Sequence, residues 1–163
     1  MPVTAPEYLD LIRLADPDDP GQSVSVRVLG RDGPGTLPAH DWLDCEIVVE
    51  SEFVRAKFPT TLLPEDLTEW SGVLDSLPGE TTVSWLDSGR TPELTIEQVD
   101  PGELEVSISD FPASGVTVRV PLTPGPGWVD EQRALLAQIH ATYPSEVVES
   151  SDGIYSWRRH TPS

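Results

Sequence analysis

Residues 41–77 read DWLDCEIVVESEFVRAKFPTTLLPEDLTEWSGVLDSL and decide the expected fold. Apolar and polar positions alternate twice, from Leu43 to Val49 and again from Val54 to Phe58. A period of two is typical of strands with one buried face. After Pro64, apolar residues recur every three or four positions, at Leu67, Trp70, Leu74 and Leu77. We therefore expect two strands joined by a tight turn, followed by a helix with one apolar stripe.

The same patterns predict the elements on either side of this stretch. Alternating segments predict strands at 9–14, 24–28, 83–86, 94–96, 104–108 and 116–122, and short closing strands at 147–148 and 154–157. The segments 16–21 and 100–103 combine proline, glycine and aspartate, as turns do. Asp130 is the expected N-cap of a second helix, whose apolar face contains Leu135, Leu136 and Ile139. No internal repeat is evident in the sequence.

These elements predict an α+β fold with a mainly antiparallel sheet packed by two helices. The 163 residues suit a single domain, 1–163, with a loose leader at 1–6 and a loose tail at 158–163. A chain of this length can bury a sizeable core without disulfides or metal ions.

The charge of the chain limits its partners. It contains 28 acidic and 10 basic residues, for a formal net charge of −18. Such a surface repels phosphate backbones and anionic lipids, so we expect neither nucleic acid nor membrane as a partner. The acidic surface can instead attract a basic protein at long range. The simpler interpretation, solubility through self-repulsion, is the favoured one for the charge taken alone.

No motif in the sequence predicts a reaction. Cys45 with His40 suggests a nucleophile and a base, but Cys45 lies on the apolar face of a predicted strand, which favours a buried structural thiol. The three histidines are scattered, and Asp16 to Arg27 fails the calcium-loop pattern at its last position. We expect no metal site, no cofactor and no catalytic residue. One cysteine and no recognisable secretory signal favour the cytoplasm.

One turn combines an aromatic residue, an acid and a cation. Trp85, Asp87 and Arg90 fall within six positions, and tryptophan and arginine are favoured at binding hot spots. These three residues are the candidate binding residues of the chain. The competing interpretation is a buried Trp85 beside an exposed ion pair between Asp87 and Arg90, and it is the favoured one.

Several segments carry a resemblance to known proteins. They are Asp41–Ile47, Asp66–Trp70, Val83–Glu93, Ser114–Val118 and Gly127–Asp130. From Leu9 to Trp157 the chain resembles an uncharacterised actinobacterial family, a domain of unknown function, which implies no activity and no catalytic residue. Its layout of strand pair, helix, further strands and late helix is also similar to that of immunity proteins of bacterial toxin systems.

We therefore expect a non-enzymatic, acidic, cytoplasmic interaction protein, in one version immunity-like, that binds a basic partner protein. One alternative is a small-molecule-binding protein or enzyme with its site at the turn from Trp85 to Arg90. Another is a structural homodimer joined by a strand edge or by exposed tryptophans. A protein mimic of DNA is the least favoured, because the acids form no periodic stripe.

Overall fold

The computed structural model describes residues 8–87, 92–111 and 113–158. The expected leader lies outside these residues, as does the expected tail except for Arg158. The backbone N–H of Arg158 donates to the carbonyl of Glu146 at 2.8 Å, so the described chain is held in place up to this residue.

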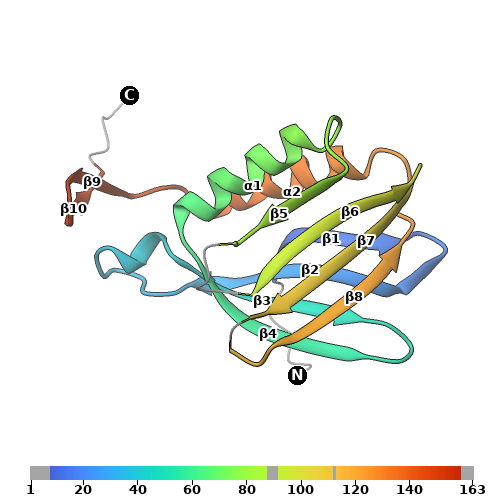
Figure 1. The fold of residues 1–163 in the computed structure, drawn as a ribbon. Helices are drawn as coiled ribbons and strands as arrows, with labels where there is room; N and C mark the ends of the chain where they lie inside the picture. The colour runs from blue at the N-terminus through green and yellow to red at the C-terminus, as the bar shows by residue number, and fades with distance from the viewer. Residues whose placement is uncertain (1–7, 88–91, 112, 159–163) are drawn as a thin grey trace, which may run out of the picture.

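The first part of the chain forms a four-stranded antiparallel sheet in the order β1-β2-β3-β4 (Figure 1). Its strands are β1 (Leu9–Asp16), β2 (Asp19–Arg31), β3 (Leu43–Glu50) and β4 (Arg55–Leu62). The register places Val26 opposite Ile12 on one side and Ile47 on the other, so that the apolar positions form one buried face. β2 begins earlier than expected, because Pro20 and Gly21 already belong to the strand.

Helix α1 (Pro64–Ser76) follows β4 after one residue. Pro64 occupies the first helical position, where its missing N–H leaves no bond unmade. The side chain of Asp66 accepts the backbone N–H of Leu63 at 2.8 Å, which satisfies a donor at the helix start. The four residues of the predicted stripe are all buried, so the helix and its apolar face are confirmed.

A second four-stranded antiparallel sheet has the order β5-β6-β7-β8. Its strands are β5 (Thr82–Trp85), β6 (Glu93–Asp100), β7 (Glu103–Asp110) and β8 (Val116–Leu122), and helix α2 (Trp128–Thr142) follows them. In the predicted turn at 100–103, Gly102 has a φ of 80°, as a type II turn requires of its third residue. The N-cap of α2 is Gly127, and the expected cap, Asp130, lies in the first turn of the helix. The helix starts earlier because Trp128 and Val129 pack against the core.

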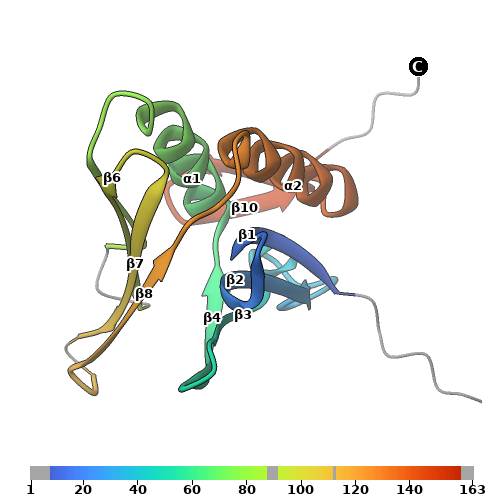
Figure 2. The same ribbon diagram turned by 90° about the vertical axis from the view of Figure 1, so that its right-hand side faces the viewer.

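The α+β class is confirmed, but the expected single sheet is divided into two. Each half consists of four antiparallel strands and then one helix, a structural repeat that the sequence does not reveal. The two helices lie side by side along the neighbouring edges of the two sheets, α2 against β1 and α1 against β5 (Figure 2). Between these layers lies the core, where the rings of Trp70 and Trp85 are 5.3 Å apart.

Three outer strands of the two sheets, β1, β4 and β8, are protected from pairing with a further strand in different ways. Along β1, the buried side chain of Gln132 replaces a neighbouring strand, since it accepts the N–H of Arg13 and donates to its carbonyl, both at 2.9 Å. β4 contains Pro59 and β8 contains Pro121, and both strands carry exposed cationic side chains. Proline and lysine or arginine on an edge strand discourage pairing with another chain.

The last two strands form a separate hairpin. β9 (Val147–Ser151) and β10 (Ile154–Trp157) pair antiparallel with each other and join neither four-stranded sheet. The hairpin extends away from the sheets at one end of the molecule (Figure 1). We call residues 145–158 the C-terminal arm.

Candidate functional site

The predicted binding turn is only partly described. Trp85 is 1% exposed, and its indole N–H donates to the carbonyl of Asp66 at 2.8 Å. Trp85 is therefore part of the core. Asp87 is exposed, and Arg90 lies outside the described residues. Between Trp85 and Asp87, Leu86 has a φ of 63°, a strained conformation for a residue with a side chain. A ligand site formed by Trp85, Asp87 and Arg90 stays a prediction.

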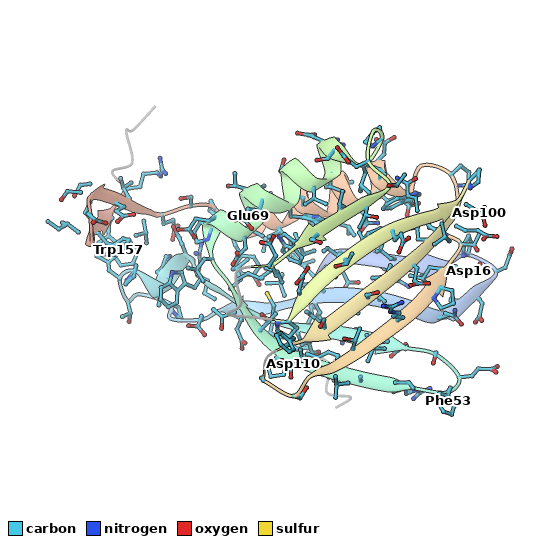
Figure 3. The ribbon with its side chains drawn as sticks, viewed as in Figure 1. Asp16, Phe53, Glu69, Asp100, Asp110 and Trp157 are labelled. Atoms are coloured by element: carbon cyan, nitrogen blue, oxygen red, sulfur yellow. The ribbon has the colours of Figure 1, made fainter. Side chains whose placement is uncertain are left out.

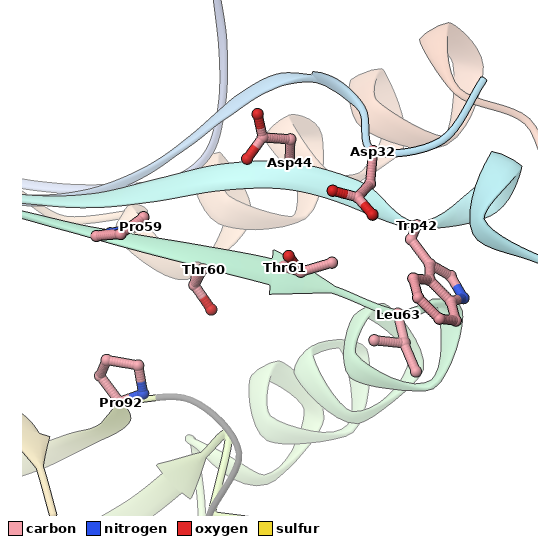
Figure 4. A pocket seen from close by; sticks show the side chains of 8 residues that line it. All are labelled: Asp32, Trp42, Asp44, Pro59, Thr60, Thr61, Leu63 and Pro92. Carbon is pink, nitrogen blue, oxygen red and sulfur yellow. The ribbon is translucent and has the colours of Figure 1, made fainter. Parts of the chain in front are cut away.

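A hollow of about 490 Å³ lies along the edge of β4 (Figure 4), and among its lining residues is Pro92, which follows the predicted turn in the sequence. Pro92 lines one side, and Trp42 and the carboxylates of Asp32 and Asp44 line the other. Thr60 also lines the hollow, and its buried hydroxyl has no hydrogen-bond partner among the described residues. An unpaired buried hydroxyl is unfavourable unless a ligand or water completes it.

Acidic side chains from three turns gather at the end of the molecule opposite the C-terminal arm. The β1–β2, β3–β4 and β6–β7 turns all lie there, as the positions of Asp16, Phe53 and Asp100 in Figure 3 show. Gln22, next to the first turn, donates to the carbonyl of Pro121 on β8 at 2.5 Å and so ties the two sheets together at this end. We call this surface the acidic end. Its acids are Asp16, Asp18, Asp19, Glu50, Glu52, Asp100 and Glu103.

Ion pairs within the protein occupy many of its few cations. Arg133 contacts Asp75 at 2.8 Å, and Arg119 contacts Glu105 at 3.4 Å. Other pairs join Arg27 to Asp10 and Glu46, and Arg31 to Asp41 and Glu146. Since 28 acids face 10 cations, this pairing leaves most carboxylates without a cation, and the negative charge is a property of the surface.

Apolar surface is also exposed at the acidic end. The side chain of Phe53, in the β3–β4 turn, is 94% exposed. It lines a hollow of about 340 Å³ with Val54 of the same turn and with Val118 and Val120 of β8. A larger hollow of about 660 Å³ lies between the β1–β2 turn and α2, where Trp128 contributes to its wall. Apolar surface rimmed by charge is the usual composition of a protein-binding site.

The C-terminal arm is fastened to the body at its base by a buried carboxylate. Asp41 accepts the backbone N–H of Glu146 at 3.0 Å and that of Val147 at 2.8 Å. Arg31 donates to Asp41 at 3.1 Å and to the carbonyl of Pro144 at 3.0 Å. Their side chains are 5% and 13% exposed, so these charge-assisted bonds are little weakened by water.

His40 and Glu146 form a second contact at the same place. His40 Nε2 contacts the carboxylate of Glu146, while its Nδ1 accepts the backbone N–H of Gly35 at 2.8 Å. Nε2 thus contacts the arm, while the bond from Gly35 to Nδ1 fixes the orientation of the ring. The ring also packs against Trp157, with centroids 4.8 Å apart. Within the described part of the chain, the hydrogen-bond partners of the His40 ring are Gly35 and Glu146.

Cys45 is not paired with His40. Its thiol is buried in the core between the two sheets and α1. Burial, with a smaller effect of the nearby Asp44 carboxylate, raises the pKa of the Cys45 thiol to about 12. The thiol is therefore protonated and inert at neutral pH. Within the described residues there is no cluster of side chains suited to a metal ion.

Sequence reasoning missed the acidic end and the base of the arm for the same reason. Asp41 and Val147 are 106 positions apart, and no local pattern connects them. The turns of the acidic end were each recognised as turns, but only the division into two sheets brings them to one end of the molecule. Among the described residues no helix is long and apolar enough to cross a membrane.

Comparison with known proteins gives a family and one distant structural neighbour. No curated protein sequence matches the chain. A solved structure described as a guideRNA-binding protein complex bound to a gRNA aligns with 85% of this chain and 94% of that chain, at 14% identity and a TM-score of 0.46. Residues 9–144, which include both sheets and both helices but not the hairpin, match DUF5959. The chain therefore belongs to DUF5959, a family of unknown function.

Proposed function

We propose that this protein is a non-enzymatic interaction module whose acidic end binds a basic partner protein. The observation that carries the proposal is that carboxylates from three turns of the two sheets lie at one end of the molecule, which also carries the exposed Phe53 (Figure 3). Long-range attraction would bring a basic partner to this end, because none of the ion pairs among the described residues involves a carboxylate of the acidic end.

Charge and apolar surface have different roles in this binding. Carboxylates at the rim of an interface act mainly on the rate of association and on specificity. Affinity comes from burial of apolar side chains, and full burial of a phenylalanine contributes roughly 1.5–3 kcal/mol. Phe53 is the largest such contribution available at the acidic end, because almost all of its surface is free.

The proposed compartment is the cytoplasm, which suits a protein whose single cysteine is a buried thiol. The similarity of layout to immunity proteins adds a candidate for the partner, a basic toxin neutralised by this chain. This immunity-like function requires a single partner protein bound with high affinity in place of several partners bound weakly.

The test compares two variants with equal changes in charge. The first replaces Asp18 and Asp19 by asparagine at the acidic end, and the second replaces Glu65 and Glu69, exposed on α1, by glutamine. Proteins captured from a lysate of the source cells are identified, purified and mixed with each variant. We expect the captured partner to be a basic protein. Its association rate should fall several-fold with the first variant and little with the second. High salt should lower the association rate of the wild type and of both variants. An acidic partner, or equal effects of the two variants, would contradict the proposal.

A second candidate function is the binding of a small cationic ligand in the hollow along β4. The unpaired hydroxyl of Thr60 favours it, because a ligand N–H would complete that group while Asp44 compensates the charge. A series of alkyl amines would then raise the unfolding temperature of the wild type but not that of Thr60→Val. If no amine shifts the wild type, this second function is wrong.

A further inference from the structure

The edge of β10 lacks the protection seen at the edges of β4 and β8. β5 also contains neither charge nor proline, but α1 contacts it. β4 and β8 are interrupted by proline and carry Arg55, Lys57 or Arg119. β9 carries Glu149 and a bulge, since the register passes from Ser151 to Glu149. β10 reads Ile154-Tyr155-Ser156-Trp157 and contains neither charge nor proline. Such an edge is ready to pair with another strand.

The apolar side chains of β10 are left uncovered by the body. Ile154 is 59% exposed, Tyr155 38% and Trp157 45%, although Trp157 also touches His40. A two-stranded hairpin is by itself marginally stable in water, and three or more strands give an independent sheet. The arm is nevertheless fixed at its base by Asp41, so its edge is presented in one orientation.

The direction of the free backbone groups follows from one hydrogen bond. The N–H of Arg158 donates to Glu146 and therefore points toward β9. Neighbouring residues of a strand point their backbone groups to opposite sides, so those of Trp157 and Tyr155 point away from β9. No hydrogen bond within the described chain uses these groups, and they form a regular free edge.

We propose that β10 pairs antiparallel with β10 of a second copy of this chain, about a two-fold axis at Ser156. In this register Tyr155 lies opposite Trp157 of the second copy, and Trp157 opposite Tyr155. Each of these pairs exchanges both of its backbone N–H···O bonds, because these are the residues whose groups point outward. The aromatic side chains of each pair lie on the same face, which adds cross-strand contact. The two hairpins become one four-stranded sheet.

Charge favours this orientation of the two arms. Two bodies of net charge −18 repel each other, but the arms extend away from the bodies and β10 itself is uncharged (Figure 1). The antiparallel register also brings Arg158 of each copy beside the acidic turn that contains Asp152 of the other. Salt weakens this attraction, but it also screens the larger repulsion between two bodies of net charge −18, so the dimer strengthens as salt is added.

Sedimentation velocity of the full chain, over a range of concentrations in dilute buffer and at high salt, tests the proposal. We expect a monomer–dimer equilibrium that shifts toward the dimer at high salt. Trp157→Pro removes a backbone N–H that points away from β9 and leaves the hydrogen bonds between β9 and β10 intact. Tyr155→Lys places a positive charge on the edge of β10, as Arg55 and Lys57 do on β4. Both should weaken dimerisation by at least about tenfold. Trp157→Val retains the N–H and should weaken it less.

Phe53→Ser is the matched control, since it removes an exposed apolar side chain at the opposite end of the molecule. Retained protection of the Arg158 amide in hydrogen exchange shows that the arm still folds in each variant. A wild type that stays monomeric at every concentration and salt would overturn the proposal, as would a dimer that Trp157→Pro leaves intact or that Phe53→Ser weakens equally. These outcomes are independent of the acidic end, because binding there weakens with salt.

Discussion

Replacing Asp41 by alanine tests how the C-terminal arm is held. The substitution removes the acceptor for two backbone N–H groups of the arm and for Arg31, with the shortest of these bonds at 2.8 Å. Each hydrogen bond to a charged group contributes about 1.5–3 kcal/mol. Arg31, which is 13% exposed, is also left without its buried counter-ion. We therefore expect the arm to lose roughly 3 kcal/mol of local stability, the lower part of the range for breaking a buried pair.

This loss should remain confined to the arm. The sheets and helices have their own core, and neither β9 nor β10 contributes a residue to it. Local opening of the arm by about 3 kcal/mol corresponds to roughly 100-fold faster exchange of its protected amides. The Arg158 amide, bonded to Glu146, is the best reporter because Asp41 does not contact it directly.

The assay is hydrogen exchange on Asp41→Ala, Asp41→Asn and Asp32→Asn. Asp32 is an exposed acid of the same loop and serves as the control. The asparagine at position 41 retains one acceptor and should give an intermediate acceleration, while the control should resemble the wild type. Unchanged exchange of the Arg158 amide in Asp41→Ala would refute this reasoning. A single transition in which the body unfolds together with the arm would refute the independence of the arm.

Four further predictions concern the body. Gln132→Leu should lower the free energy of unfolding in urea by about 2 kcal/mol, because it leaves two backbone groups of β1 unsatisfied, whereas Gln138→Leu on the exposed face of α2 should have little effect. Cys45 should react with a thiol reagent only as fast as the protein unfolds, and immediate labelling of the native state would contradict its burial. Pro59→Val restores an edge N–H and should increase light scattering on concentration; a variant as monodisperse as the wild type would show that proline does not protect β4. Burial raises the pKa of Asp10 above 3.8, and the positive charges of Arg27 and Arg13 partly offset this effect. The contribution of Asp10 to stability therefore falls as the pH rises from 3.8 through its folded-state pKa. Urea titrations across that pH range should show Asp10→Asn gaining stability relative to the wild type.

Local sequence was sufficient for most of the helices and strands. Alternation from Leu43 to Val49 and the stripe that includes Trp70 each follow from one element packing one face on a core. The start of α2 was wrong because a capping preference at Asp130 is weaker than the burial of Trp128 and Val129.

The division into two sheets was beyond local patterns, since strands of either sheet alternate in the same way. The base of the arm depends on Asp41 meeting residues more than a hundred positions away. Among the predicted binding residues, Trp85 is buried, and this favours the interpretation that it is an aromatic side chain of the core. Charge composition allowed a basic partner, although solubility was the favoured interpretation of the charge alone, and it could not predict the end of the molecule at which the acids gather.

The positions of the two proposed surfaces determine the composition of a complex. The arm and the acidic end lie at opposite ends of the chain (Figure 3), so pairing of two arms leaves the two acidic ends far apart. If both proposals hold, one basic partner of ordinary size cannot contact both acidic ends, and each chain would bind its own partner. We expect one partner per chain whether the chain is monomeric or dimeric, and we expect Trp157→Pro to halve the mass of the complex without changing that ratio. A complex with one partner for each dimer would require the acidic ends to meet, and the arrangement of β10 about Ser156 would then be wrong.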